Sequence, residues 1–486
     1  MWDKTSPLLV GVDIGTSGVR AQAFALSGEC VAEGRASFAT SYPGDGRAEQ
    51  EPGDWWLATV QALRKIVAHL GSLTHFIAGI GLTGQCPTFT YLLPSGETVG
   101  SGLVYQDNRA VAETDALIRH FGIAALHQRT GQAASPFYVL PKLLWLKQHQ
   151  GRPPAGATVV QPRDLVAWHL TGRCATDPTH AACTLAYDLL RGAWATDWLA
   201  ELGLQSLNWP EILAPDSVPG YLTAEAAAAT GLTRGTPIVM GAADSICAAY
   251  STGTTGAGVL CEVTGTSTCL HLTIAQPAKD EAINTYPHVL PGAWYAEAGL
   301  NTTGGALAWL TTLLGKSYVQ LLQEASTIQP GAGGLSFLPH LSRGERDQPT
   351  RQGAFVGLQI SHTSGHMARA LLEGVAYALR QRVELLTTIG GNITRVISCG
   401  GGARSPLWTQ IKADILGLPI SLVSPTDTAT WGAALLVSAA LDLPVTASPF
   451  VLNDFQPDQN NTEAYRAHYE RFCQLETLLT AAPDQL

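Results

Sequence analysis

Three short turns in the 486-residue sequence combine glycine with hydroxyl side chains, the residue types that surround phosphate groups in proteins. DIGTSG begins at Asp13, TGTST covers residues 264–268, and GGGARS covers residues 400–405. Backbone amides in such turns point at bound anions, and a helix start adds favourable polarity. Each turn taken alone could equally be a tight hairpin or a short strand-to-helix connection. Their co-occurrence favours phosphate binding, and because the GxxxxGK[ST] pattern does not occur, the site is not a P-loop.

Asp244 closes the apolar run TPIVMGAAD, so it is predicted to lie at the carboxyl end of a buried strand. Phosphoryl transfer needs a base at the acceptor hydroxyl, and a carboxylate in this position can accept that proton. The alternative is that Asp244 caps the helix SICAAYSTG, because aspartate is a preferred N-cap residue. The two roles are compatible.

Strand and helix patterns alternate around these turns. Apolar strands are predicted at 8–15, 19–26 and 76–84, and three- and four-residue apolar spacing predicts a helix at 51–71. A second strand–turn–strand unit at 258–273 repeats the first about 250 residues later. Alternating strands and helices indicate an α/β protein with covered sheets, built from two related domains.

The length points to two or three domains. We expect an N-terminal domain at 1–252, a C-terminal domain at 253–445, and a partly helical tail at 446–486. The region 110–225 is predicted to be rich in helix, and residues 366–391 form a long helix that stops at a Gly-Gly pair.

The composition excludes several classes of protein. A net charge of −10 gives no basic field for nucleic acid or for an anionic membrane. The nine cysteines are scattered without metal-binding spacing, which predicts reduced thiols and neither a disulfide framework nor a zinc site. The N-terminus lacks an apolar segment of signal-peptide length, and no uninterrupted apolar stretch would span a bilayer. The predicted location is therefore cytoplasmic.

A set of longer segments resembles the FGGY carbohydrate kinases, and within them the xylulokinases. The resemblance extends from about residue 8 to residue 440 and is most specific from Gly353 to Glu373. It implies an actin-like ATPase (ribonuclease H-like) fold with two domains and an interdomain active-site cleft. The segments that carry it are GVDIGTSGVR, EPGDWW, TGQ, YQDNR, PKLLWL, GAADSICAAY, TGTS, FLPHLSRGER, GAFVGL, HMARALLEGVAYAL and GGGARSPLWTQIKADILGLPI.

The resemblance implies a role for each matching residue. Asp244 is the catalytic base and also contacts the sugar, and Asp13 is the residue associated with Mg²⁺. The phosphates of ATP lie near Gly15, Thr16, Ser17, Gly265, Thr266 and Ser267. The adenosine lies near Gly401, Gly402 and Arg404. The other sugar-binding positions are Gln85, Cys86 and Asp107.

Two departures from the xylulokinase pattern affect the predicted sugar site. Xylulokinases usually carry Met-His-Gly where this chain has Cys86, Pro87 and Thr88. They usually carry Trp-Asn-Asp-Gly-Arg where this chain has YQDNR, residues 105–109. A polar contact and a flat apolar wall are therefore lost. Arg109 could pair with Asp107 instead of touching a substrate.

The function predicted from these observations is transfer of the γ-phosphoryl group of ATP, with Mg²⁺, to a primary hydroxyl of a ketopentose. D-xylulose is the first expectation and D-ribulose the second. The alternatives are a kinase for another ketose, a polyol or glycerol, and a non-catalytic sensor that binds ATP or sugar. A homodimer is compatible with the sequence.

Overall fold

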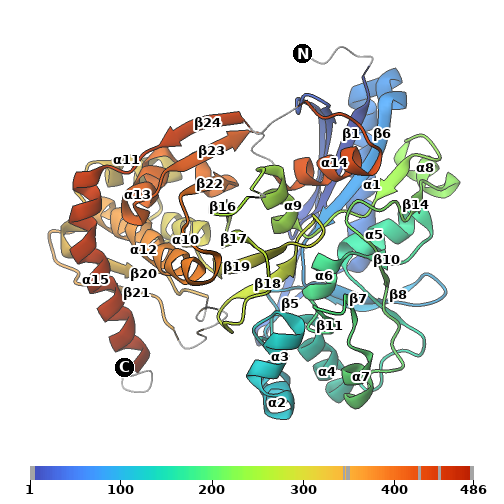
Figure 1. Ribbon diagram of the computed structural model, residues 1–486, viewed down its shortest axis with the longest axis horizontal. Coiled ribbons are helices and arrows are strands. Elements are labelled where there is room, and N and C mark those ends of the chain that lie inside the picture. Colours follow the sequence, from blue (N-terminus) through green and yellow to red (C-terminus); the bar gives the residue numbers. More distant parts are fainter. Residues whose placement is uncertain are drawn as a thin grey trace. The chain divides into compact units, whose positions relative to one another are not determined.

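The computed structural model describes residues 6–254, 256–342, 345, 348, 351–424, 428–446 and 450–481. The chain divides into two compact units, and each contains segments from different parts of the sequence (Figure 1). Unit 1 comprises residues 1–253, 276–294 and 427–448, and unit 2 comprises residues 254–275, 295–426 and 449–486.

Unit 1 contains a six-stranded sheet with the order β14-β15-β6-β1-β2-β3. Strand β1 runs parallel to β6, and β6 runs parallel to β15, whereas β2 is antiparallel to both of its neighbours, β1 and β3. The predicted strands around the first turn and at 76–84 are confirmed. The bounds are β1 (Leu8–Ile14), β2 (Gly18–Ala25), β3 (Cys30–Ser37), β6 (Ile77–Gly84), β14 (Gly220–Tyr221) and β15 (Pro237–Val239).

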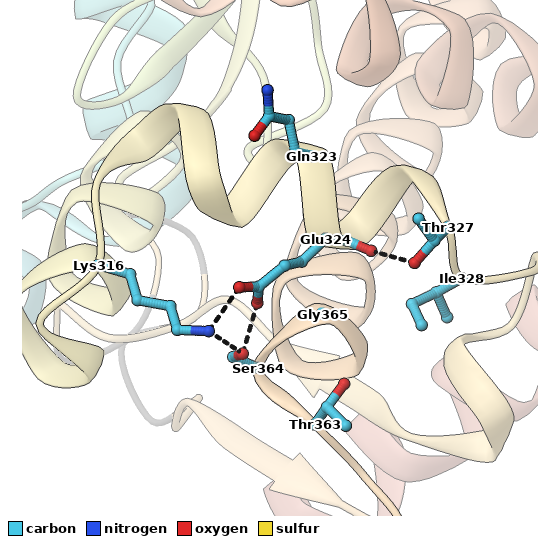
Figure 2. A pocket seen from close by; sticks show the side chains of 8 residues that line it. All are labelled: Lys316, Gln323, Glu324, Thr327, Ile328, Thr363, Ser364 and Gly365. Atoms are coloured by element: carbon cyan, nitrogen blue, oxygen red, sulfur yellow. Dashed lines mark hydrogen bonds and ion pairs between the residues drawn. The ribbon is translucent and has the colours of Figure 1, made fainter.

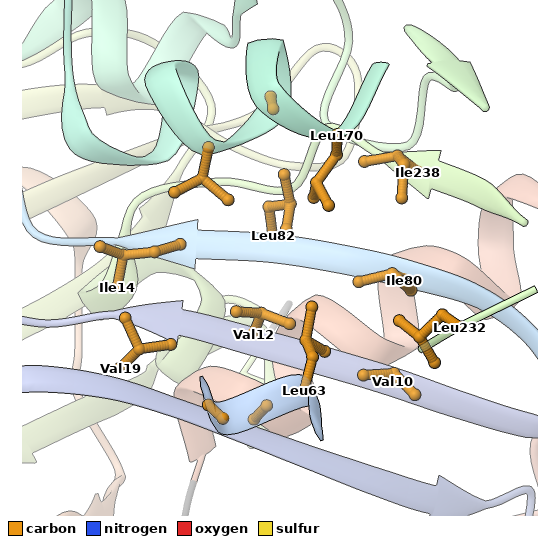
Figure 3. Close-up of a cluster of buried hydrophobic side chains, with 14 of the residues drawn as sticks. Val10, Val12, Ile14, Val19, Leu63, Ile80, Leu82, Leu170, Leu232 and Ile238 are labelled. Carbon is orange, nitrogen blue, oxygen red and sulfur yellow. The ribbon is translucent and has the colours of Figure 1, made fainter. Parts of the chain in front are cut away.

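One face of this sheet builds the main core of unit 1. Alternate residues of β1, including Val10, Val12 and Ile14, pack with side chains from α1 (Pro52–Leu70) and α5 (Pro162–Thr171) (Figure 3). Because successive strand residues point to opposite faces, the intervening positions of β1 and β6 face the other way. The helix predicted at 51–71 is confirmed as α1.

Glycines on the second face let a helix approach the strands closely. Helix α14 (Thr428–Ala440) lies beside β1 and β6, although it follows them by more than 340 residues (Figure 1). A Cβ on Gly11 would lie 1.9 Å from the carbonyl oxygen of Thr430, and one on Gly81 would lie 2.1 Å from that of Ala433. The residues 427–448 therefore complete unit 1.

The remainder of unit 1 is a five-stranded sheet with the order β4-β5-β8-β7-β9 and several helices around a second core. The helix-rich character predicted for residues 110–225 is confirmed. The sheet strands are β4 (Ser41–Gly44), β5 (Arg47–Gln50), β7 (Phe89–Leu92), β8 (Thr98–Leu103) and β9 (Thr158–Val160). The helices are η1 (Gly71–Phe76), α2 (Val111–Phe121), α3 (Ile123–Thr130), α4 (Val139–His149), α6 (Pro178–Ala182), α7 (Thr196–Glu201), α8 (Ala224–Thr230) and α9 (Asp244–Ser251). Short strands are β10 (Ala175–Thr176), β11 (Tyr187–Asp188), β12 (Ala193–Trp194), β13 (Glu211–Ile212) and β18 (Asn284–Pro287).

Unit 2 contains a sheet in which β19, β17, β16, β22, β23 and β24 follow one another. Strand β16 is antiparallel to β17 and parallel to β22, which repeats the pattern of β1 with β2 and β6. The strands are β16 (Val259–Thr264), β17 (Thr268–Ile274), β19 (Trp294–Leu300), β20 (Ser336–Leu338), β21 (Ala354–Val356), β22 (Arg395–Cys399), β23 (Ile420–Ser424) and β24 (Phe450–Phe455). The helices are α10 (Gly304–Leu314), α11 (Tyr318–Ser326), η2 (Ala332–Gly334), α12 (Ser364–Gly390), η3 (Gly401–Arg404), α13 (Pro406–Leu416) and α15 (Gln459–Ala481).

The long helix predicted at 366–391 is confirmed as α12, which buries much of its length. Beyond residue 446, strand β24 joins the edge of the unit 2 sheet beside β23, and α15 packs on α13. Among the helices of the described residues, none combines the length and apolar character needed to cross a membrane.

The close contact between α14 and the sheet can be tested with Gly81→Ala. Its Cβ has to displace backbone, so we expect a loss of about 1–3 kcal/mol or more in the free energy of unfolding. Gly53→Ala is the matched control, because its Cβ would meet nothing closer than 3.9 Å and it lies in helix α1. There, alanine should be neutral or stabilise by up to about 1 kcal/mol. Calorimetric unfolding of both variants is the measurement, and equal melting temperatures would contradict the packing argument.

Candidate active site

Asp13 and Asp244 stand at the same edge of the unit 1 sheet. Asp13 is opposite Thr83 on β6, and Gly84 at the end of β6 forms a parallel bridge with Ala243, the residue before Asp244. The two aspartates are thus separated by one intervening strand, and two strand spacings of about 4.8 Å place their backbones roughly 10 Å apart. Both residues are half-buried.

The turn after β1 is held in shape by backbone contacts. The Gly15 amide donates to the Gly18 carbonyl at 3.0 Å, and Gly18 has a φ of 152°. A Cβ at Gly18 would lie 2.2 Å from the Ala36 carbonyl oxygen, so only glycine fits there. The Thr16 carbonyl accepts a bond from the Gln50 side chain, and Ser17 is exposed at the tip. The phosphate contacts of Gly15, Thr16 and Ser17 stay a prediction.

Gln85 lies at the same edge, directly after β6. Its side-chain amide donates to Gln50 Oε1 at 2.9 Å, and the Thr88 hydroxyl donates to Gln85 Oε1. The Gln85 side chain is almost fully buried. Its orientation is therefore set before any ligand arrives, whereas its contact with a sugar stays a prediction.

Asp107 forms an ion pair with Arg109. This pairing is the alternative to a substrate contact of Arg109 that the sequence left open. Arg109 Nε donates to Asp107 Oδ1 at 2.8 Å, and Nη2 reaches Asp107 Oδ2 and Glu49. The Ala48 amide donates to Asp107 Oδ2 at 2.8 Å. Burial lowers the pKa of Arg109, but the bonds to Asp107 and Glu49 outweigh this and raise it. The fully buried Asp107 carboxylate thus positions neighbouring residues, and its predicted contact with a sugar stays a prediction.

A buried ion pair fixes the strand that leads to Asp244, and the sequence analysis missed it. Arg163 Nη2 lies 3.0 Å from Asp177 Oδ1, and both side chains are fully buried. Arg163 Nη1 donates to the Met240 carbonyl at 2.6 Å, and His180 Nδ1 lies 2.7 Å from Asp177 Oδ1. Burial alone would raise the pKa of Asp177, but Arg163, His180 and a threonine hydroxyl lower it to about 2. The carboxylate is therefore ionised at neutral pH.

Thr179 connects this ion pair to the residue before Asp244. Its hydroxyl donates to Asp177 Oδ2 at 2.6 Å and accepts from the Ala243 amide at 2.8 Å. Asp244 is the first residue of α9, while Ala243 occupies the N-cap position. Asp244 Oδ1 accepts from the Ser245 amide at 2.6 Å, so its carboxylate also interacts favourably with the helix start.

The second phosphate turn is a hairpin in unit 2, between β16 and β17. The Gly265 amide donates to the Ser267 carbonyl at 2.8 Å. The first amides of α10, those of Gly304 and Gly305, donate to the carbonyls of Gly265 and Thr266. Gly265 and Thr266 are exposed, and Ser267 is half-buried. The start of α10 therefore fixes the hairpin, while the tip of the hairpin is open to solvent.

The glycine turn after β22 lies against this hairpin. Because β16 and β22 are parallel neighbours, both turns leave the same edge of the unit 2 sheet. A Cβ at Gly400 would lie 2.5 Å from the Thr264 carbonyl oxygen, and one at Gly402 would lie 2.2 Å from Thr264 Cγ2. The sequence predicted these two turns for one nucleotide, and the structure brings them into contact within unit 2.

A buried ion pair also supports the second turn. Lys412 Nζ lies 2.5 Å from Glu262 Oε1, which accepts a further bond from the Thr264 hydroxyl at 2.8 Å. Ser398 donates to Glu262 Oε2. Burial raises the pKa of Glu262, but Lys412 and these hydroxyls outweigh it and lower the pKa.

A cavity of about 550 Å³ in unit 2 includes two of the predicted adenosine-binding residues, Gly401 and Arg404. Its wall is largely apolar, as is typical of sites for flat aromatic ligands. The other lining residues come from α11 and from the start of α13: Tyr318, Val319, Leu322, Gln323, Ser326, Ser405, Pro406 and Leu407.

A neighbouring cavity of about 530 Å³ shares Gln323 but contains none of the predicted site residues (Figure 2). Its charged groups are satisfied by one another, since Lys316 Nζ contacts both Glu324 and Ser364. The cavity at Gly401 is therefore the better candidate for a nucleotide.

The predicted magnesium position differs in its donor atoms from a second group of potential metal ligands. Asp13 offers a carboxylate, which suits Mg²⁺. Within the described residues, Cys269, His271 and Glu297 of unit 2 also have ligand atoms within 4.8 Å of one another. A thiol and an imidazole suit softer ions, so this group is not a magnesium site.

Comparison with known proteins identifies the family. Residues 8–251 match the N-terminal domain of the FGGY family of carbohydrate kinases, and residues 261–441 match its C-terminal domain. The chain belongs to this family and is an ATP-dependent sugar kinase with the two-domain FGGY fold. Its substrates are a small sugar and ATP.

Individual relatives agree with this assignment. A xylulose kinase from Klebsiella pneumoniae is 30% identical over 96% of this chain and 98% of its own length, and one from Staphylococcus xylosus is 28% identical over 88% and 90%. The crystal structure of xylulose kinase from Rhodospirillum rubrum covers 98% of this chain and all of its own, with a TM-score of 0.89 and 31% identity. Plasmodium falciparum glycerol kinase with ADP shares the fold, with a TM-score of 0.84 at 18% identity over 97% of this chain and 98% of its own.

The ion pair behind Asp244 can be tested with Asp177→Asn. Arg163 keeps a second buried carboxylate partner, since its Nη2 lies 2.8 Å from Asp164 Oδ1. The change still weakens the charge-assisted bonds of Asp177 to its neighbours, so we expect a loss of about 1–3 kcal/mol in the free energy of unfolding at pH 7. Because the folded pKa of about 2 lies below the ordinary value of 3.8, the contribution of wild-type Asp177 is complete above that value. It is lost as the pH falls toward 2.

The control is Asp197→Asn, the same change at a carboxylate that binds Arg129 but is 61% exposed. It should cost less than about 1 kcal/mol. Urea unfolding of both variants between pH 2 and about 7 is the measurement. Equal losses in the two variants would contradict the role of the buried pair.

Proposed function

We propose that this sugar kinase transfers the γ-phosphoryl group of ATP to a primary hydroxyl of a ketopentose, with D-xylulose as the first candidate. The observation that carries the proposal is the alignment of Asp13, Gln85 and Asp244 at one edge of the unit 1 sheet. The names of the relatives, which are xylulose kinases, support the choice of xylulose.

Asp244 acts as the general base. Its carboxylate is half-buried, and its backbone is fixed through Ala243 and Thr179, so the carboxylate can be aimed at an acceptor hydroxyl. It takes the hydroxyl proton as the oxygen attacks the γ-phosphorus. The bond from the Ser245 amide holds one oxygen of this carboxylate.

Asp13 holds the magnesium ion on this proposal. The fit rests on its chemistry and position, since a carboxylate lies at a strand end next to the Gly15–Ser17 turn. Mg²⁺, when bound, neutralises charge on the phosphates of ATP. Unit 1 carries the predicted phosphate turn Gly15–Ser17, and unit 2 carries the turn Gly265–Ser267 and the cavity lined by Gly401 and Arg404. Gly402, the third predicted adenosine position, lies in the same glycine turn of unit 2.

D-ribulose, another ketose or a polyol would use the same machinery and are the remaining substrate candidates. Glycerol is disfavoured, because Gln106 and Asp107 stand where an Arg-Glu pair is expected of a glycerol kinase. We also propose, from the order of the sequence, domain boundaries at 252/253 and 445/446, a cytoplasmic location and a homodimer. The compact units follow these boundaries except that unit 1 also takes in residues 276–294 and the segment that contains α14, and that the residues after 448 belong to unit 2.

The role of Asp244 is tested with Asp244→Asn. An amide cannot accept the proton, so kcat should fall by roughly 10²–10⁴-fold with little change in the KM for ATP. Asp115→Asn, on the exposed side of α2, is the control and should retain wild-type activity. ADP release in the presence of the sugar is the measurement. A near-normal kcat for the Asp244→Asn protein would show that Asp244 is not the general base.

The sugar is tested with a panel of ketopentoses, ketohexoses, polyols and glycerol in the same assay. We expect D-xylulose to give the highest kcat/KM. A higher value for another member would reassign the substrate and leave the kinase reaction intact. Bound ATP without ADP release for any member would favour a sensor instead.

A further inference from the structure

Two cysteines that are 97 positions apart in the sequence meet in unit 1. The Sγ atom of Cys183 lies 3.2 Å from the Sγ atom of Cys86. Cys86 follows Gln85 at the edge of the sheet, and Cys183 follows the short helix α6. Spacing alone does not pair these two residues among nine cysteines, because only the fold brings them together.

The two thiols differ in their exposure. Cys86 is half-buried, whereas Cys183 is only 3% exposed. An oxidant can therefore reach Cys86 first, while Cys183 is sheltered directly behind it. A reachable thiol beside a second thiol is the arrangement of a redox-sensitive cysteine with its resolving partner.

We propose that Cys86 and Cys183 form a modification site at which a peroxide makes a disulfide that suppresses sugar phosphorylation. The Cys86 thiolate attacks one peroxide oxygen, the O–O bond breaks, and a sulfenic acid and hydroxide form. The Cys183 sulfur then attacks the Cys86 sulfur, the S–S bond forms, and the sulfenic oxygen leaves as water. In total, two thiols are oxidised and hydrogen peroxide is reduced to two molecules of water.

The effect on catalysis rests on the proposed function. Cys86 adjoins Gln85, a proposed sugar contact. Cys183 ends helix α6, in which Thr179 holds the Ala243 amide next to Asp244. A covalent bond would join the sugar-binding turn to the segment that positions the base, and both would have to adjust as the sulfurs approach. The nucleotide cavity in unit 2 contains neither cysteine. Oxidation should therefore impair use of the sugar and leave the binding of ATP unchanged.

The experiment compares wild-type protein, Cys183→Ser and Cys30→Ser after treatment with hydrogen peroxide and again after a thiol reductant. Cys30→Ser is the matched control, since it removes an exposed thiol away from the pair. Mass spectrometry of proteolytic peptides detects a Cys86–Cys183 link, and coupled ADP release gives kcat/KM for the sugar. If Cys183→Ser does not fold, Cys183→Ala replaces it.

We expect linked peptides in the wild type and in Cys30→Ser, with kcat/KM for the sugar lowered roughly 10- to 100-fold and restored by the reductant. In Cys183→Ser, the loss that the reductant reverses should disappear. The proposal is overturned if the wild type yields no linked peptide, if the link forms without a kinetic effect, or if the reversible loss persists in Cys183→Ser. Reduced wild type that phosphorylates no ketose would instead refute the proposed function, and the linked peptide would still decide the modification site.

Discussion

The parallel alignment of β1, β6 and the segment before α9 is the constraint on which the unit 1 site depends. Parallel strands bring their carboxyl ends to one edge, and here the register sets Asp13 opposite Thr83 and Ala243 opposite Gly84. The residues that follow each strand therefore emerge side by side, although Asp13 and Asp244 are far apart in sequence. The backbones of the two residues, separated by two strand spacings, are roughly 10 Å apart. A shift of register in β6 would separate the two aspartates without altering either residue.

Close packing and buried charge maintain this alignment at two different places. Away from the edge, Gly11 and Gly81 let α14 rest against the strands, so the sheet cannot slide without clashes of backbone with backbone. At the edge, Arg163 binds the Met240 carbonyl and Asp177. Unit 2 also combines close glycine packing with a buried ion pair. Gly400 and Gly402 pack on Thr264, and Lys412 pairs with Glu262 next to it. A buried ion pair contributes little net stability, but it has few alternative geometries. It therefore suits the strand ends that carry the predicted site residues.

The sequence predicted the strands, the long helix and the three glycine turns, because strand and helix periodicity and turn chemistry are local properties. It did not predict Arg163 or Asp177. PRDLVAW reads as an ordinary helix start, and the contact from Arg163 to Met240 spans 77 positions. The pair of Asp107 with Arg109 is local and was foreseen as an alternative. The cysteine pair was not foreseen, since spacing rules detect ligands that are close in sequence and Cys86 and Cys183 meet only through the fold.

The identity of the sugar depends on side chains that this chain has changed. Discrimination between ketopentoses that differ in one hydroxyl group comes from polar groups fixed in the site, because an unpaired buried donor or acceptor is costly. Gln85, the proposed sugar contact, would be such a group, and its amide is fixed by Gln50. Pro87 stands where a histidine is expected, and its side chain offers neither a donor nor an acceptor. Tyr105 replaces an indole, and its ring packs edge-on against Phe137 at 5.7 Å. With fewer strong side-chain donors around Gln85, the site should discriminate less sharply between stereoisomers than one with a histidine at the same place.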